Sequence, residues 1–119
     1  KLQKSGKGPI VIIGHSLGAD AAVLMARSMG EKHARVALLV LFGPDYATTA
    51  PANASQIVNY HGGGAVVTKG TRFSGSITNI NLDTQAGINH FNVEKVERFH
   101  ASVIARIQKI MRGSTRNNQ

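Results

Sequence analysis

Cysteine and tryptophan are absent from the 119 residues, and proline occurs only three times. Without cysteine, the chain has no disulfide framework, no cysteine ligands for zinc and no thiol nucleophile. The absence leaves the cellular compartment open, because exported bacterial proteins often lack disulfides. No apolar run approaches the roughly 18–20 residues that a helix needs to cross a bilayer. The sequence therefore predicts no transmembrane segment.

Acidic residues are scarce as well, with six aspartates and glutamates against fourteen lysines and arginines, so the formal net charge is +8. The excess lies at the two ends of the chain. Residues 1–8 carry a balance of +3 and residues 93–119 carry +4, which leaves +1 for the 84 residues between them. Because this basicity is confined to the ends and is not interleaved with aromatic residues, we expect no nucleic-acid partner.

The remaining composition is that of a globular protein, with 42% hydrophobic and 17% charged residues. A chain of this length forms one domain at most. We expect a flexible lead-in over 1–8, a folded domain over 9–111 and a disordered tail over 112–119. The chain starts with Lys1, and no signal-peptide pattern precedes the first apolar run, so we interpret it as a fragment or a processed chain.

Two continuous apolar runs, at 10–13 and 36–42, are typical of strands buried on both faces of a parallel sheet, and residues 56–60 are predicted to be a third strand. A fourth run, at 76–83, alternates apolar and polar residues and is predicted to be a strand at the sheet edge. The segment 46–55 is expected to be a loop. The segment 65–76 is expected to be a loop or a short hairpin.

Two segments are predicted to be helices. Residues 19–29 are rich in alanine, leucine and methionine and end before Gly30, a common stop signal. Residues 93–111 place apolar side chains at helical spacing, with Asn92 as the candidate N-cap. Alternating strands and helices predict an α/β fold, in which helices flank a parallel sheet. Ligands bind such sheets at the carboxyl ends of the strands.

One pentapeptide, Gly14-His15-Ser16-Leu17-Gly18, stands between the first strand and the first helix. The pattern Gly-x-Ser-x-Gly in this position is that of a nucleophile elbow, whose strained turn needs glycines on both sides of the serine. The helix after it directs free N–H groups toward the site. Ser16 is therefore the predicted nucleophile, and the N–H of Leu17 is the predicted oxyanion donor.

Two other interpretations of this glycine-rich turn are a serine helix cap and a nucleotide-binding loop. A phosphate-binding P-loop would require Gly-Lys-Ser or Gly-Lys-Thr after its spacer, and a dinucleotide-binding loop would require the spacing G-x-G-x-x-G. Neither pattern occurs here.

The stretch GPIVIIGHSLGADAAVLMA resembles the strand, elbow and helix of lipases and thioesterase-like α/β-hydrolases, especially small bacterial lipase-like enzymes with a GHSLGA elbow. The resemblance is strong over 9–30 and looser over 31–111. It implies a partial α/β-hydrolase fold, from the elbow strand through the final helix. It also implies that a missing N-terminal half or a partner chain supplies the second oxyanion donor.

In that family the catalytic histidine lies on the loop between the last strand and the last helix, where this chain has a GINHFNVEK segment, so the resemblance implies His90 as the general base. The other four histidines have different expected roles. His15 packs inside the elbow beside the substrate site, and His61 ends a strand at the edge where it would contact substrate. His33 lies at the opposite end of the sheet, and His100 lies on the apolar face of the last helix.

The acid departs from the common family pattern. The family usually places it after the third strand of this set, where the chain reads HGGGA and has no carboxylate before Asp83. Some lipases place the acid after the preceding strand, and Asp45 fits that position. Asp83 is the alternative, seven residues before His90. Either aspartate could instead be a turn residue beside Gly or Pro.

The expected chemistry is acyl transfer to water. Ser16 would attack a carboxylic ester or thioester of a small molecule and form an acyl-serine intermediate, with His90 as base and Asp45 orienting it. No cofactor and no metal is expected. The alternative is a non-catalytic hydrolase-like module that binds an acyl ligand or a partner protein.

Overall fold

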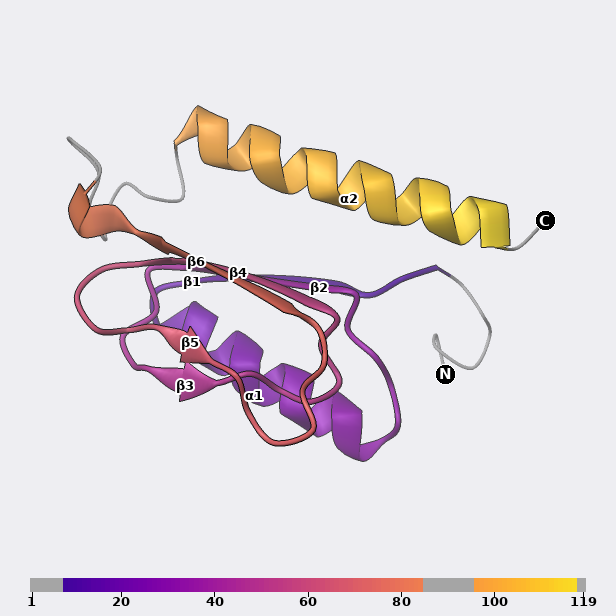
Figure 1. Ribbon diagram of the computed structural model, residues 1–119, viewed down its shortest axis with the longest axis horizontal. Helices are drawn as coiled ribbons and strands as arrows, with labels where there is room; N and C mark the ends of the chain where they lie inside the picture. Colours follow the sequence, from indigo (N-terminus) through magenta and orange to yellow (C-terminus); the bar gives the residue numbers. More distant parts are fainter. Residues whose placement is uncertain (1–7, 85–95, 118–119) are drawn as a thin grey trace.

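Four parallel strands form one sheet in the order β1-β2-β4-β6 in the computed structural model, which describes residues 8–84 and 96–117. The strands are β1 (Val11–His15), β2 (Leu38–Phe42), β4 (Gln56–His61) and β6 (Ser76–Asn81). Helix α1 (Leu17–Glu31) covers one face of the sheet and α2 (Glu97–Asn117) covers the other (Figure 1). The predicted α/β fold with a parallel sheet and flanking helices is confirmed at this level.

The register of the sheet brings the strand ends together. His15 is opposite Phe42, Phe42 is opposite Tyr60, and Tyr60 is opposite Ile80. Because all four strands are parallel, the loops that follow them begin at a single edge of the sheet. The candidate residues after β1, β2, β4 and β6 therefore belong to one region of the molecule.

The sequence of β2 is a continuous apolar run because the strand is buried on both faces. Its five residues are at most 5% exposed. Leu39 and Leu41 belong to the core on the α1 side, whereas Leu38, Val40 and Phe42 belong to the core on the α2 side. A strand covered on both faces has no position for a polar side chain, so the alternating pattern is lost.

The two outer strands differ from the interior ones. The alternating strand β6 lies at one edge, as predicted. The other edge of the described sheet is β1, and Ile13 is 52% exposed there. The prediction that the first run is buried on both faces was wrong for the described residues. As an edge strand, β1 has a neighbouring strand on one side only, and Ile13 remains exposed.

Helix α1 is longer than predicted and includes Gly30. The glycine is needed for close packing rather than as a stop signal, since a Cβ there would lie 2.9 Å from the side-chain carbon Cγ of Asn53. The Asn53 amide donates to the carbonyls of Ala26 at 2.8 Å and Ala34 at 2.9 Å. Asn53 thus ties the last turns of α1 to the segment that follows the helix.

Helix α2 also differs from its predicted bounds. It begins after Val96, whose carbonyl accepts bonds from the N–H groups of Phe99 and His100, both at 3.1 Å; Asn92 lies outside the described residues. The helix ends at Asn117, so the disordered tail expected over 112–119 was wrong for 112–117. Once packing has formed a helix, each further residue needs only propagation, which tolerates Gly113 at a cost of about 1 kcal/mol.

The segments expected to be loops contain a second small sheet. Strands β3 (Thr48–Thr49) and β5 (Val67–Thr68) pair in parallel, so the hairpin considered for 65–76 does not form. The Asn79 side chain of β6 bonds to both backbone groups of Val67, at 3.0 and 2.9 Å. The Asn79 side chain here makes the two hydrogen bonds that a neighbouring strand would make with its backbone. Such a contact leaves no periodic pattern in the sequence, so β5 could not be predicted.

Candidate active site

Ser16 adopts an unusual backbone conformation between β1 and α1, with φ 60° and ψ −128°. Few residues other than glycine adopt a positive φ, and such a conformation costs on the order of 1–3 kcal/mol. Two bonds hold the turn: the Ser16 N–H donates to the Phe42 carbonyl, and the Ser16 carbonyl accepts from the Ala19 N–H, both at 2.9 Å. The strained turn expected of a nucleophile elbow is therefore present at this serine.

The glycines on either side of Ser16 have different environments. A Cβ on Gly14 would lie 2.8 Å from the Cα of Ala19, so the strand can approach the helix only with glycine at this position. A Cβ on Gly18 would have no described atom within 4 Å. Nothing in the described part of the chain explains why residue 18 is glycine.

The serine does not act as a helix cap. No side-chain cap hydrogen bond is made by Ser16, which directly precedes the first residue of α1, Leu17. The structural alternative to the elbow therefore loses its main support. The N-terminus of α1 adjoins the serine, as the predicted oxyanion role of the Leu17 N–H requires.

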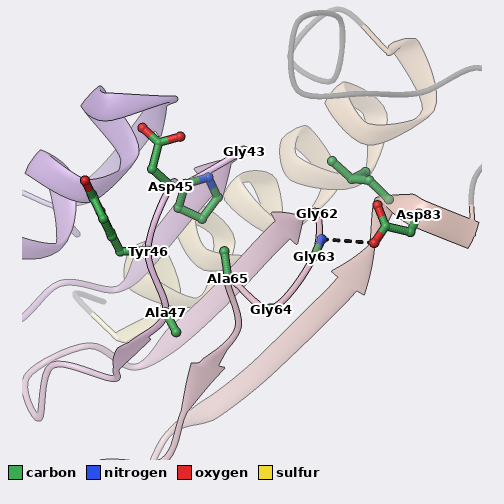
Figure 2. A pocket seen from close by; sticks show the side chains of 11 residues that line it. Gly43, Asp45, Tyr46, Ala47, Gly62, Gly63, Gly64, Ala65 and Asp83 are labelled. Carbon is green, nitrogen blue, oxygen red and sulfur yellow. Dashed lines mark hydrogen bonds between the residues drawn. The ribbon is translucent and has the colours of Figure 1, made fainter.

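Both candidate acids line one pocket of about 620 Å³ at the carboxyl edge of the sheet. Its walls come from the loops after β2, β4 and β6, and four of its lining residues are glycines. Figure 2 shows Asp45 and Asp83 on opposite sides of this pocket. The lining residues are Gly43, Pro44, Asp45, Tyr46, Ala47, Gly62, Gly63, Gly64, Ala65, Leu82 and Asp83.

The carboxylate of Asp83 forms a hydrogen bond with the neighbouring loop. It accepts the Gly63 N–H at 3.0 Å, the bond drawn in Figure 2, while the Asp83 N–H donates to the Asn81 side chain at 2.9 Å. Asp83 follows β6, which is separated from β1 by β2 and β4. Its bonds are those of a turn residue that ties two loops together.

Asp45 is closer to the elbow in the sheet order. It follows β2, the neighbour of β1, and comes three residues after Phe42, whose carbonyl holds the Ser16 N–H. Its side chain is exposed, and its backbone N–H donates to Asp20 on α1 at 3.1 Å. The sequence alone predicts no role for Asp20. An acidic residue in the first turn of the helix that follows the elbow was the available sequence signal, but such a residue usually only complements the helix dipole.

The histidines divide into described and undescribed positions. His90, the predicted base, lies outside the described residues. His61 is only 4% exposed and does not line the pocket, so its position gives no support to the predicted contact with substrate. Its ring atom Nδ1 has no hydrogen-bond partner among the described residues.

His15 and His100 lie together on the α2 side of the sheet. Both border a groove of about 530 Å³ between β1 and α2, and the rest of its lining is almost entirely apolar. His100 contacts the Phe42 ring edge-on, with 6.3 Å between ring centroids. This position at the margin of the core is the one expected for His100.

An aromatic stack supports the sheet under these loops. The rings of Phe42 and Tyr60 are parallel at 4.9 Å, and Phe99 of α2 packs on Tyr60 at 4.4 Å. Burial raises the pKa of the Tyr60 phenol from its ordinary value of 10.0, against smaller opposing effects of Ser102 and Arg106. The stack joins the ends of β2 and β4 to α2.

No family model, curated protein or solved structure matches the chain. The strained turn at Ser16 and the loops beside it are the features of the molecule that bear on its function. Within 8–84 and 96–117, no group of three or more metal-ligating side chains occurs, and neither helix is long and apolar enough to span a membrane.

Proposed function

We propose that this chain is the elbow-bearing part of a serine hydrolase of the α/β-hydrolase type, which cleaves a carboxylic ester or thioester. The backbone of Ser16, with φ 60° and ψ −128°, is the observation that carries the proposal. A strained serine between a parallel strand and a helix has a cost in stability that function would explain. The parallel strand before Ser16 and the N-terminus of α1 after it support the same chemistry.

The proposed reaction proceeds in two halves. The Ser16 Oγ attacks the substrate carbonyl carbon, and its proton passes to a general base, for which His90 is our candidate. The bond to the leaving group then breaks, and the leaving group takes that proton. Water next attacks the acyl-serine ester with help from the same base, which releases the carboxylic acid and restores the serine. The Leu17 N–H would stabilise the oxyanion in both halves.

Asp45 is the better candidate for the acid that orients the base. It follows the strand next to β1, whereas Asp83 follows the far edge strand and already binds the Gly63 N–H. An acid in this role holds the imidazole tautomer and stabilises the imidazolium. We keep Asp83 as the alternative.

The second oxyanion donor is proposed to come from a further strand beside β1. The Leu38 N–H donates to the Ile10 carbonyl and the Ser16 N–H donates to the Phe42 carbonyl, so the backbone groups of even-numbered residues along β1 face β2. By alternation, the backbone groups of Val11 and Ile13 point the other way, where no described strand pairs with them. We propose that an N-terminal segment or a partner chain adds there and brings the donor.

A fluorophosphonate probe tests the core of the proposal on the full-length protein. We expect stoichiometric labelling that Ser16→Ala abolishes. Ser28→Ala, which changes an exposed serine on the same helix, is the matched control and should keep full labelling. An unlabelled wild-type protein, or labelling that survives Ser16→Ala, would show that Ser16 is not an activated nucleophile.

The second candidate function is an acyl-binding module without catalysis. The apolar groove between β1 and α2, lined in part by Ile13, Ile104 and Ile107, favours it. This reading predicts no fluorophosphonate labelling, together with saturable binding of a fluorescent fatty acid that Ile104→Glu abolishes. Labelling of Ser16 would reject it.

A further inference from the structure

Helix α1 carries two polar side chains that hold the segment after β2. Asp20 and Arg27 are seven residues apart, which places them on the same side of the helix. The Asp20 oxygens accept the N–H groups of Asp45 at 3.1 Å and Tyr46 at 3.3 Å. One carboxylate thus binds two successive backbone amides, and such charge-assisted bonds are stronger than bonds between neutral groups.

Arg27 holds the other end of the same segment. Its Nη2 donates to the Thr49 carbonyl at 2.7 Å, to the Thr49 hydroxyl at 3.1 Å and to the Thr48 hydroxyl at 3.3 Å. The segment 45–49 is therefore attached to α1 at both ends.

The backbone before Asp45 is constrained as well. Gly43 has φ 64°, its N–H donates to the Tyr60 carbonyl at 2.7 Å, and Pro44 has a φ fixed by its ring. Asp20 then fixes the N–H of Asp45 itself. The backbone is set on both sides of Asp45, which lines the pocket and has an exposed side chain (Figure 2).

The carboxylate of Asp20 accepts hydrogen bonds from the loop after β2. A carboxylate in the first turn of a helix commonly complements that helix's own free N–H groups. Here both of its oxygens bind amides of the loop after β2, which are 25 and 26 residues further along the chain. A catalytic acid must be held to within about 0.5 Å, and a misplacement of about 1 Å can cost roughly 100-fold in rate.

We propose that Asp20 is a positioning residue for Asp45. The inference rests on the proposed hydrolase function with Asp45 as its acid. Asp20 touches neither substrate nor base in this scheme and acts only through the backbone of Asp45 and Tyr46. The elbow helix thereby sets both the nucleophile, at its N-terminus, and the acid, through its first turn.

A double-mutant cycle in the full-length protein tests the inference, with a chromogenic short-chain ester as substrate. We expect Asp20→Asn to lower kcat about 10- to 100-fold with KM within threefold, because the NH2 group of the amide is a donor and replaces one of the two oxygens that accept the N–H groups of Asp45 and Tyr46. In an Asp45→Asn background, Asp20→Asn should have no further effect. Glu31→Gln removes the same charge from the other end of α1 and should leave kcat unchanged.

The pH profile separates positioning from general stability. A carboxylate beside an imidazole favours the protonated ring, so misalignment of the acid moves the acidic limb of kcat/KM to lower pH. We expect the same direction of shift in Asp20→Asn and Asp45→Asn, and none in Glu31→Gln. The amides of Asp45 and Tyr46 should also exchange faster with solvent in Asp20→Asn.

The outcomes distinguish the inference from the function on which it rests. Hydrolysis that survives Ser16→Ala rejects both. If Ser16 is essential, an unchanged kcat and pH profile in Asp20→Asn rejects the positioning role alone, as does an equal loss in the Asp45→Asn background. If Asp20→Asn does not fold, Asp20→Ser, with a side chain suited to a helix N-terminus, replaces it in the same cycle and is judged by the same criteria.

Discussion

The loops after β2 and β6 each carry an aspartate to the same pocket, but they hold it in different ways. The carboxylate of Asp83 binds the neighbouring loop through the Gly63 N–H, so the side chain is part of the scaffold. In the loop after β2 the roles are reversed. The scaffold holds the backbone of Asp45 through Gly43 and Asp20, and the carboxylate itself is exposed.

This difference separates two uses of one residue type. The bond from the Gly63 N–H holds the Asp83 carboxylate against the loop after β4, so any rotation of that side chain would cost the bond. A carboxylate on a backbone fixed by other residues is available for chemistry. Both aspartates come within three residues of a strand end, and the bonding pattern in the folded chain distinguishes them.

The largest expected effect is that of Asp45→Asn. The amide keeps the shape of the side chain but cannot hold the base in the correct tautomer, so we expect kcat for ester hydrolysis to fall by about 10³- to 10⁴-fold. Thermal unfolding should change little, because the side chain is exposed. A kcat within threefold of wild type would remove Asp45 from the mechanism and make Asp83 the leading candidate.

Gly43→Ala tests the backbone constraint before Asp45. Its φ of 64° is unfavourable for alanine, so the free energy of unfolding should fall by about 1–2 kcal/mol. Chemical denaturation measures this change, and kcat should fall about tenfold as the loop shifts. Gly64→Ala in the loop after β4, on the other side of the pocket, is the control, since a Cβ there meets no described atom within 4 Å and its φ is not positive. Equal effects of the two changes would contradict the comparison.

Asp83→Asn should mainly affect stability. The amide oxygen can still accept the Gly63 N–H, but the bond loses its charge assistance, so the free energy of unfolding should fall by about 0.5–1 kcal/mol. The expected kcat stays within threefold of wild type. A thousandfold loss of kcat, measured beside Asp45→Asn, would reverse the assignment of the two acids.

The smallest effect concerns Tyr60 of β4, which is fully buried and stacks on Phe42 of β2. Its pKa is raised by burial, so the folded protein holds the phenol proton more tightly than the unfolded chain does. Stability should therefore fall as the pH rises above about 10, the unfolded value, toward the higher folded value. Tyr60→Phe should lose less stability over that range, as followed by urea denaturation at pH 9 and pH 11. Parallel losses in the two proteins would contradict this assignment.

The local features of the fold were predictable because they depend on neighbouring residues. The run Leu38–Phe42 has no polar position, which indicates a strand buried on both faces, and it forms β2. The Gly-x-Ser-x-Gly spacing indicated a strained turn, and Ser16 adopts one. Gly30 shows the limit of such reasoning, since the stop signal in the sequence is a packing contact with Asn53 in the structure.

The sequence by itself determined the parallel strands, the two helices and the strained serine between them, since each depends on residues within a few positions of one another. Only the tertiary structure decided which aspartate lies beside the elbow strand. No local sequence pattern specifies the order of strands in a sheet. In the folded chain β2 lies next to β1, so the loop after β2 begins beside Ser16. The bond between Asp20 and Asp45 likewise joins residues 25 positions apart, which only the packing of α1 against the sheet brings together.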